Sequence, residues 1–142
     1  MKTKLHKWML SLLFIGAGML SSCSDEMAGF GKGDTSSWLN GSTWQVSGAS
    51  SDGHQMVLTL GFNGGQVTYQ EYDNTAGTSI NVYGPFKHSG KSLKFKFIKE
   101  WQNQIKNMSI FPKTAELYHD TNNIYNSYII YNDNKFMFQQ DW

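Results

Sequence analysis

The chain has 142 residues, with 12 basic residues, all of them lysines, against 11 acidic residues and a formal net charge of +1. The lack of arginine argues against a nucleic-acid partner, because phosphate binding uses clustered cations and usually arginine forks. A single cysteine excludes an internal disulfide, so the fold must be stabilised by packing.

The first 22 residues have the layout of a bacterial export signal. Three lysines, Lys2, Lys4 and Lys7, precede an apolar run over residues 8–20. This order predicts a secretory signal peptide. The run is shorter than the roughly 20 apolar residues that a helix needs to cross a membrane. We therefore expect residues 1–22 to direct export and then to be removed.

The signal ends in Leu20-Ser21-Ser22-Cys23, which resembles the lipobox of bacterial lipoproteins. The resemblance implies cleavage before Cys23 and a diacylglycerol on its sulfur. The alternative is an ordinary secretory signal, but that would leave one unpaired thiol in an exported protein. Two or three long acyl chains, palmitate among them, hold a protein far more firmly on a bilayer than one chain does. Cys23 is the predicted lipidation site, and the membrane is the predicted partner.

Residues 23–37 are predicted to form a flexible lipidated tether, because they are mostly small, polar or glycine. The acidic pair Asp25-Glu26 resembles the short export signal of surface-exposed lipoproteins in Bacteroidetes. This resemblance implies a cell-envelope protein, anchored in the outer membrane and displayed on the cell surface. The alternative is that the two acids are only solvated tether residues. The folded domain is expected over residues 38–142.

Beyond residue 38 the chain shows the period-two alternation of half-buried strands, broken by turn residues. Asparagine and glycine in those turns tolerate the positive φ that tight hairpins require. The predicted hairpins are, in chain order, residues 56–72 about Asn63-Gly64-Gly65, residues 80–98 about a turn at 88–91, and residues 127–139 about Asn132-Asp133-Asn134.

Residues 100–120 are predicted to form one short helix or an irregular crossing, because apolar residues recur at helical spacing until Pro112 ends the pattern. A further strand is expected near residues 115–118. Seven or eight short strands with tight turns predict an all-β fold, an antiparallel up-and-down barrel, which removes exposed strand edges. A β-sandwich is the alternative, since period two alone does not separate the two.

The first strand begins with Gly41-Ser42-Thr43-Trp44, which resembles the Gly-x-Trp start of lipocalins and other calycins with one extra residue in the spacing. The resemblance implies that Trp44 packs across the closed end of the barrel. It also implies an open mouth that holds one small apolar ligand. Residues 38–142 are few for a full lipocalin, so a filled core is the alternative.

No catalytic residue, metal site or cofactor is predicted. The three histidines of the mature chain, His54, His88 and His119, lie in or beside turns and have no zinc-site spacing. The sequence has neither a nucleophile elbow nor a phosphate loop. We therefore expect a non-enzymatic lipoprotein that binds a small apolar ligand.

Tyr72, Tyr83 and Tyr131 are predicted to face outward, where a row of rings could bind a sugar, a peptide or a partner protein. Cross-strand ring pairing that only stabilises the sheet is the favoured alternative. Two further functions stay open. One is a structural or protein-interaction lipoprotein with a filled core, and the other is a carbohydrate-contacting accessory protein.

Overall fold

The computed structural model describes residues 33–100 and 108–141, which form a β structure with two short 3-10 helices and, within these ranges, no α-helix. The predicted signal peptide, Cys23 and most of the predicted tether lie outside the described residues. The strands are β1 (Ser42–Ala49), β2 (Gln55–Asn63), β3 (Gln66–Asp73), β4 (Thr78–Ser89), β5 (Ser92–Phe95), β6 (Lys99–Glu100), β7 (Thr114–Tyr118), β8 (Tyr128–Tyr131) and β9 (Asn134–Asp141), and the 3-10 helices are η1 (Met108–Ile110) and η2 (Ile124–Asn126).

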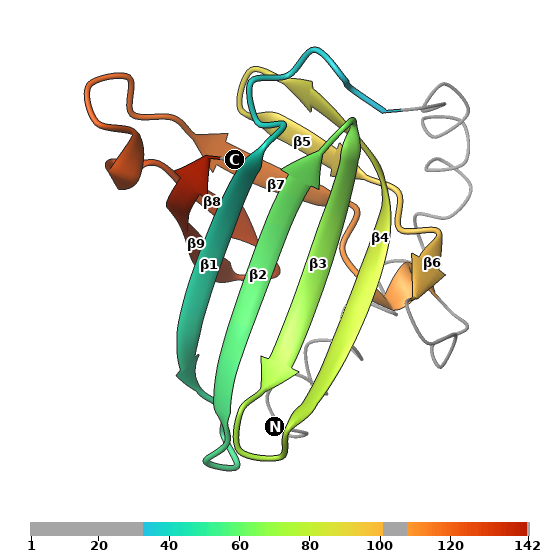
Figure 1. Cartoon of the computed structure of the whole chain (residues 1–142), viewed down its shortest axis with the longest axis vertical. Helices are drawn as coiled ribbons and strands as arrows, with labels where there is room; N and C mark the ends of the chain where they lie inside the picture. Colours follow the sequence, from blue (N-terminus) through green and yellow to red (C-terminus); the bar gives the residue numbers. More distant parts are fainter. Residues whose placement is uncertain (1–32, 101–107, 142) are drawn as a thin grey trace.

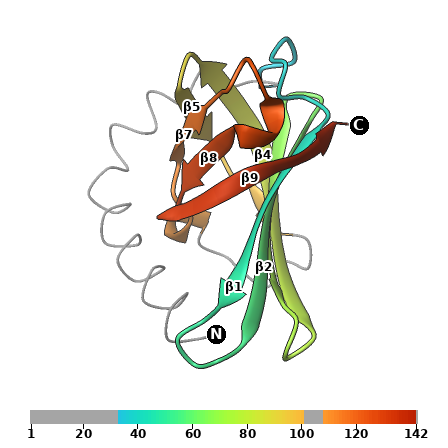
Figure 2. The same cartoon turned by 90° about the vertical axis from the view of Figure 1, so that its left-hand side faces the viewer.

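The strands close into a barrel. Their order is β3-β2-β1-β9-β8-β7-β5-β4, every pairing in it is antiparallel, and β3 also pairs with β4 to complete the ring. The short β6 adds to β4. Figures 1 and 2 show the strands surrounding a common interior. The predicted up-and-down barrel is confirmed, and the β-sandwich is excluded because the ring has no open edge between two sheets.

The predicted hairpins form where the turn residues indicated them. Asn132 and Asp133 both have positive φ, 54° and 61°, in the turn between β8 and β9. These are the backbone angles that a tight hairpin turn needs, and asparagine and aspartate tolerate them better than most residues. The strand expected near residues 115–118 is β7. The helical pattern about Trp101 and Ile105 lies outside the described residues.

Trp44 marks one end of the barrel, called here the Trp44 end. Its side chain is fully buried, and its ring meets that of Phe138 edge-on at 5.2 Å. The indole Nε1 donates to Ser42 Oγ at 2.8 Å, and Ser42 Oγ donates to the Leu39 carbonyl at 2.5 Å. Leu39, itself fully buried, thus ties the chain before β1 to the tryptophan. A buried indole N–H has its partner, as a buried polar group requires.

Residues 33–37 contact the barrel, although the sequence assigns them to the tether. The Asp34 N–H donates to the Phe86 carbonyl at 2.7 Å, and Ser37 Oγ lies 2.7 Å from His88 Nδ1. A Cβ on Gly33 would collide with the Gly65 carbonyl. Residues 33–37 of the predicted tether therefore lie against the barrel.

The two halves of the barrel differ in height. Strands β1 to β4 have 8, 9, 8 and 12 residues, whereas β5, β7 and β8 have 4, 5 and 4. Figures 1 and 2 show that β1 to β4 continue past the short strands, down to the β1–β2 and β3–β4 hairpins. We call this lower end the hairpin end. One side of the barrel is thus taller than the other.

Candidate functional site

The strand register places four side chains in one line across the inner face of β1 to β4. Val46 pairs with Leu58, Leu58 pairs with Glu71, and Glu71 pairs with Ile80. Because paired residues on adjacent strands point to the same face, their side chains are neighbours. We call these four residues the inner row. It lies one step along the strands from the row of Trp44, Leu60, Tyr69 and Val82, on the side of the hairpin end.

The inner row is apolar except for one carboxyl group. Leu58 and Glu71 are buried, with exposed fractions of 5% and 3%. Val46 and Ile80, at the two ends of the row, are only partly buried and pack against the core. The row is therefore a strip of apolar surface that solvent reaches at both ends, with an acid in it.

Glu71 has one oxygen paired and one oxygen free. Its Oε2 accepts a hydrogen bond of 2.7 Å from the Tyr69 hydroxyl. Its Oε1 is buried and has no hydrogen-bond partner among the described residues. Burial raises the pKa of Glu71 to about 7, against which the Tyr69 hydrogen bond acts only in part. Burial and the neighbouring Glu71 in turn raise the pKa of Tyr69 well above its ordinary value.

Aromatic rings fill the interior beside Glu71. The ring of Tyr69 meets those of Tyr131 and Phe111 edge-on, at 5.2 Å and 5.9 Å. Tyr131 also contacts Phe97, and its hydroxyl donates to the Pro112 carbonyl at 2.9 Å. Edge-to-face contacts at these distances are favourable beyond the apolar area that they bury. Beyond the inner row, towards the Trp44 end, the barrel is packed with side chains.

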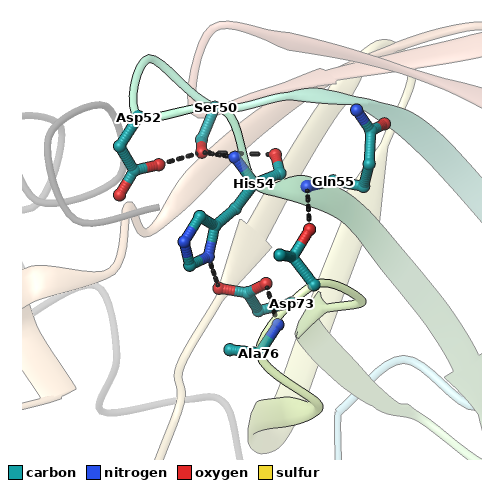
Figure 3. A network of polar contacts seen from close by, with 7 residues as sticks. Ser50, Asp52, His54, Gln55, Asp73 and Ala76 are labelled. Atoms are coloured by element: carbon teal, nitrogen blue, oxygen red, sulfur yellow. Dashed lines mark hydrogen bonds and ion pairs between the residues drawn. The ribbon is translucent and has the colours of Figure 1, made fainter.

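A polar network joins the two hairpins at the hairpin end, as Figure 3 shows. His54 Nδ1 donates to Asp73 Oδ2 at 2.7 Å, and the Ala76 N–H donates to Asp73 Oδ1 at 2.9 Å. Burial acts to raise the pKa of Asp73, but these hydrogen bonds outweigh it and lower the pKa. The Gln55 N–H donates to Thr75 Oγ1 at 2.9 Å. Asp73 thus holds the β1–β2 and β3–β4 hairpins together.

The same network is not a catalytic triad. Ser50 Oγ hydrogen-bonds to Asp52 and accepts from the His54 backbone N–H at 3.1 Å. A nucleophilic serine would need the imidazole as its base. In this site the His54 ring hydrogen-bonds to Asp73, whereas the Ser50 hydroxyl hydrogen-bonds to the Asp52 side chain and the His54 backbone (Figure 3).

The predicted tyrosine platform does not form. Tyr72 is exposed on β3 and Tyr83 is half-buried on β4, but Tyr83 pairs with Thr68, four residues from Tyr72 along β3. Four residues of strand separate them by about 13 Å. The outward assignment of Tyr131 is wrong, because this side chain is 1% exposed and lies in the core.

The other histidines have structural contacts. His119 stacks on the Trp38 ring at 4.2 Å, and His88 Nε2 donates to the Gly90 carbonyl at 2.9 Å. Among residues 33–100 and 108–141, no group of three or more histidine, cysteine or acidic side chains could hold a metal ion. No helix in these ranges is long and apolar enough to cross a membrane.

The outer face of β5, β7 and β8 carries a groove that the sequence did not predict. Its volume is about 460 Å³, and Ser92, Glu116 and Ile130 line it side by side. Next to Glu116 on β7, the rings of Tyr118 and Tyr128 stack at 4.7 Å. The groove is lined by residues that are distant in the sequence, so no local pattern predicts it.

Glu71 also went unrecognised as a site residue, although a signal for it was present. The alternation along β3 places the acid on the same face as Val67 and Tyr69. An acid on an otherwise apolar face is the pattern to look for, since buried carboxyl groups concentrate at functional sites.

Comparisons of the chain with protein-family models, with curated proteins and with solved structures give no match. What this protein does must therefore be inferred from the barrel and from the residues in it.

Proposed function

We propose that this protein is a membrane-tethered lipoprotein of the cell envelope that binds a small, largely apolar molecule at the hairpin end of its barrel. The observation that carries the proposal is the inner row. Val46 and Ile80 present partly exposed apolar surface on the inner face of the barrel, where exposed apolar groups gain most by meeting a ligand. Their buried neighbour Leu58 continues that surface inward.

The position of the ligand differs from that expected of a lipocalin. Leu58, Leu60, Phe95 and Phe97 all belong to one continuous buried cluster, so side chains occupy the middle of the barrel. The molecule therefore binds against the inner row, on the taller half, and its size is limited to what that strip covers. Burial of each methylene of such a ligand contributes about 0.8 kcal/mol.

The membrane tether is the second part of the proposal. The lysine-rich start, the apolar run and the lipobox at Cys23 support removal of residues 1–22 and acylation of Cys23. The pair Asp25-Glu26 supports an outer-membrane location with surface display. An anchored binding protein keeps its site close to the bilayer, which is itself a source of apolar molecules.

The test compares two tryptophan substitutions in the full-length lipoprotein, purified in lipid nanodiscs. Val46→Trp covers the inner row, whereas Ser47→Trp adds the same ring on the exposed, outer side of β1. Native mass spectrometry should detect a copurified small molecule in the wild type and in Ser47→Trp, and lose it in Val46→Trp. Equal occupancy in the two variants would refute a site at the inner row.

A second candidate is a protein-interaction lipoprotein with a filled core. The packed aromatic interior and the outer groove favour it. In that case Glu116→Arg, in the groove, would abolish pull-down of an envelope protein, while Val46→Trp would leave it unchanged. The carbohydrate-contacting alternative loses support, since Tyr131 lies inside the barrel and Tyr72 and Tyr83 lie apart.

A further inference from the structure

Glu71 poses a chemical problem that the rest of the inner row does not solve. Its Oε1 is buried and has no hydrogen-bond partner among the described residues. Its neighbours in the inner row, Leu58 and Ile80, are apolar and cannot donate a hydrogen bond. Buried polar groups in proteins are nearly always hydrogen-bonded, and an unpaired one is costly. The few exceptions call for an explanation, of which a bound molecule is one.

The surroundings determine what kind of group can satisfy this oxygen. Oε2 already accepts from the Tyr69 hydroxyl, so the ionised carboxyl group has room for one more donor at Oε1. The Tyr131 hydroxyl is committed to the Pro112 carbonyl and does not supply it. Ile80 is partly exposed, so Glu71 adjoins surface that a ligand can reach.

We infer that the ligand is an amphiphilic amine, whose ammonium group donates to Glu71 Oε1 while its apolar body lies against Val46, Leu58 and Ile80. This inference rests on the proposed function. An ammonium group fits better than a hydroxyl because it carries a positive charge that compensates the buried carboxylate, in addition to donating a hydrogen bond, and an opposite charge within a few ångströms favours the ionised form of an acid. A carboxylate ligand is repelled by the same acid.

Among residues 33–100 and 108–141, no cationic side chain is within hydrogen-bond distance of Glu71 Oε1. Tyr69 on β3 and Tyr131 on β8 are both neutral at ordinary pH, since burial raises the pKa of each well above its usual value. His54 is paired with Asp73 at the hairpin end. Glu100 on β6 is buried, and it pairs across to Val82 in the neighbouring row.

The experiment uses three probes with the same apolar body: hexylamine, hexanol and hexanoate. Each is titrated by calorimetry into the full-length lipoprotein in nanodiscs, with empty nanodiscs as the reference. The two variants are Glu71→Gln and Glu116→Gln, which remove the same charge from the inner row and from the exposed face of β7. The glutamine at position 71 can still accept from the Tyr69 hydroxyl, and near-ultraviolet circular dichroism verifies that each variant is folded.

At pH 8 we expect the wild type to bind hexylamine at least about 10-fold more tightly than hexanol, and hexanoate most weakly. Glu71→Gln should remove the preference for the amine, and Glu116→Gln should keep it. The affinity for hexylamine should rise from pH 6 to pH 8 in the wild type, as Glu71 ionises, and stay level in Glu71→Gln.

The outcomes separate the two proposals. Equal affinities for hexylamine and hexanol, or an unchanged preference in Glu71→Gln, would overturn the amine assignment and leave the binding function in place. If none of the three probes binds the wild type, both proposals fail. A preference that both variants lose would also overturn the assignment, because it would not depend on Glu71.

Discussion

The replacement Glu71→Gln makes stability a direct test of the buried carboxyl group. Burial raises its pKa from the ordinary value of 4.5 to about 7, so the folded protein binds this proton more tightly than the unfolded chain does. The contribution of Glu71 to stability is therefore fully present below about pH 4.5, and it is lost as the pH rises through about 7. A shift of this size corresponds to about 3 kcal/mol across the whole window.

Glutamine has nearly the same shape and cannot ionise, so the variant should lack this pH dependence. Between pH 5 and pH 8 the free energy of unfolding of the wild type should fall relative to Glu71→Gln by about 2 kcal/mol. Urea unfolding followed by near-ultraviolet circular dichroism measures it, and the expected change in the difference between midpoints is roughly 1 M. All other titrating groups are common to both proteins and cancel in the comparison.

Two results would refute the reasoning. If wild type and Glu71→Gln show the same change in unfolding free energy from pH 5 to pH 8, Glu71 does not titrate with a raised pKa. If the exposed-face variant Glu116→Gln changes the pH dependence as much as Glu71→Gln does, burial is not the cause.

Three further predictions concern packing and the anchor. Trp44→Ala should lower the free energy of unfolding by about 3–5 kcal/mol, because Trp44 is fully buried. The control Trp38→Ala, at a residue that is 40% exposed, should lower it by only about 1 kcal/mol. Equal losses for the two variants in urea unfolding would contradict this prediction. Gly84→Ala should destabilise the barrel by about 3 kcal/mol, because a Cβ at this position would collide with the Lys96 carbonyl. A melting temperature equal to that of the wild type would show that the backbones at Gly84 and Lys96 are not in such close contact. Cys23→Ala should abolish incorporation of labelled palmitate and partitioning into the detergent phase, and a variant that still takes up label would disprove acylation at Cys23.

The local sequence pattern predicted the strands and turns well, but for some strands it did not predict which face is buried in the barrel. Strand β2 alternates cleanly, since Met56, Leu58, Leu60 and Phe62 share one face, and all four are buried. Strand β8 has no such contrast. Each of its faces carries one isoleucine and one tyrosine, so hydrophobicity cannot tell which face is inside, and Tyr131 was assigned to the wrong one.

The candidate site was predicted only in part. The sequence places Glu71 on the inner face of its strand, because a period of two follows from the pleat of any strand. The sequence does not predict that the Tyr69 hydroxyl donates to Glu71 Oε2 while Oε1 has no partner among the described residues, because this pattern depends on the positions of the neighbouring strands and rings. Nor does it give the His54–Asp73 contact, which joins residues 19 positions apart.

By itself the sequence predicted the strand segments and the turns, which the structure confirms, since each depends on residues close together in the chain. The export signal is likewise a local pattern and stays a prediction. Only the tertiary structure decided that β1 pairs with β9 in a closed barrel and that β1 to β4 extend beyond the shorter strands β5, β7 and β8. It also decided that Glu71 lies between the apolar residues of the inner row. These features depend on strand pairing between residues distant in sequence. Such pairing is selected by the burial of the whole core, and a local pattern carries no record of it.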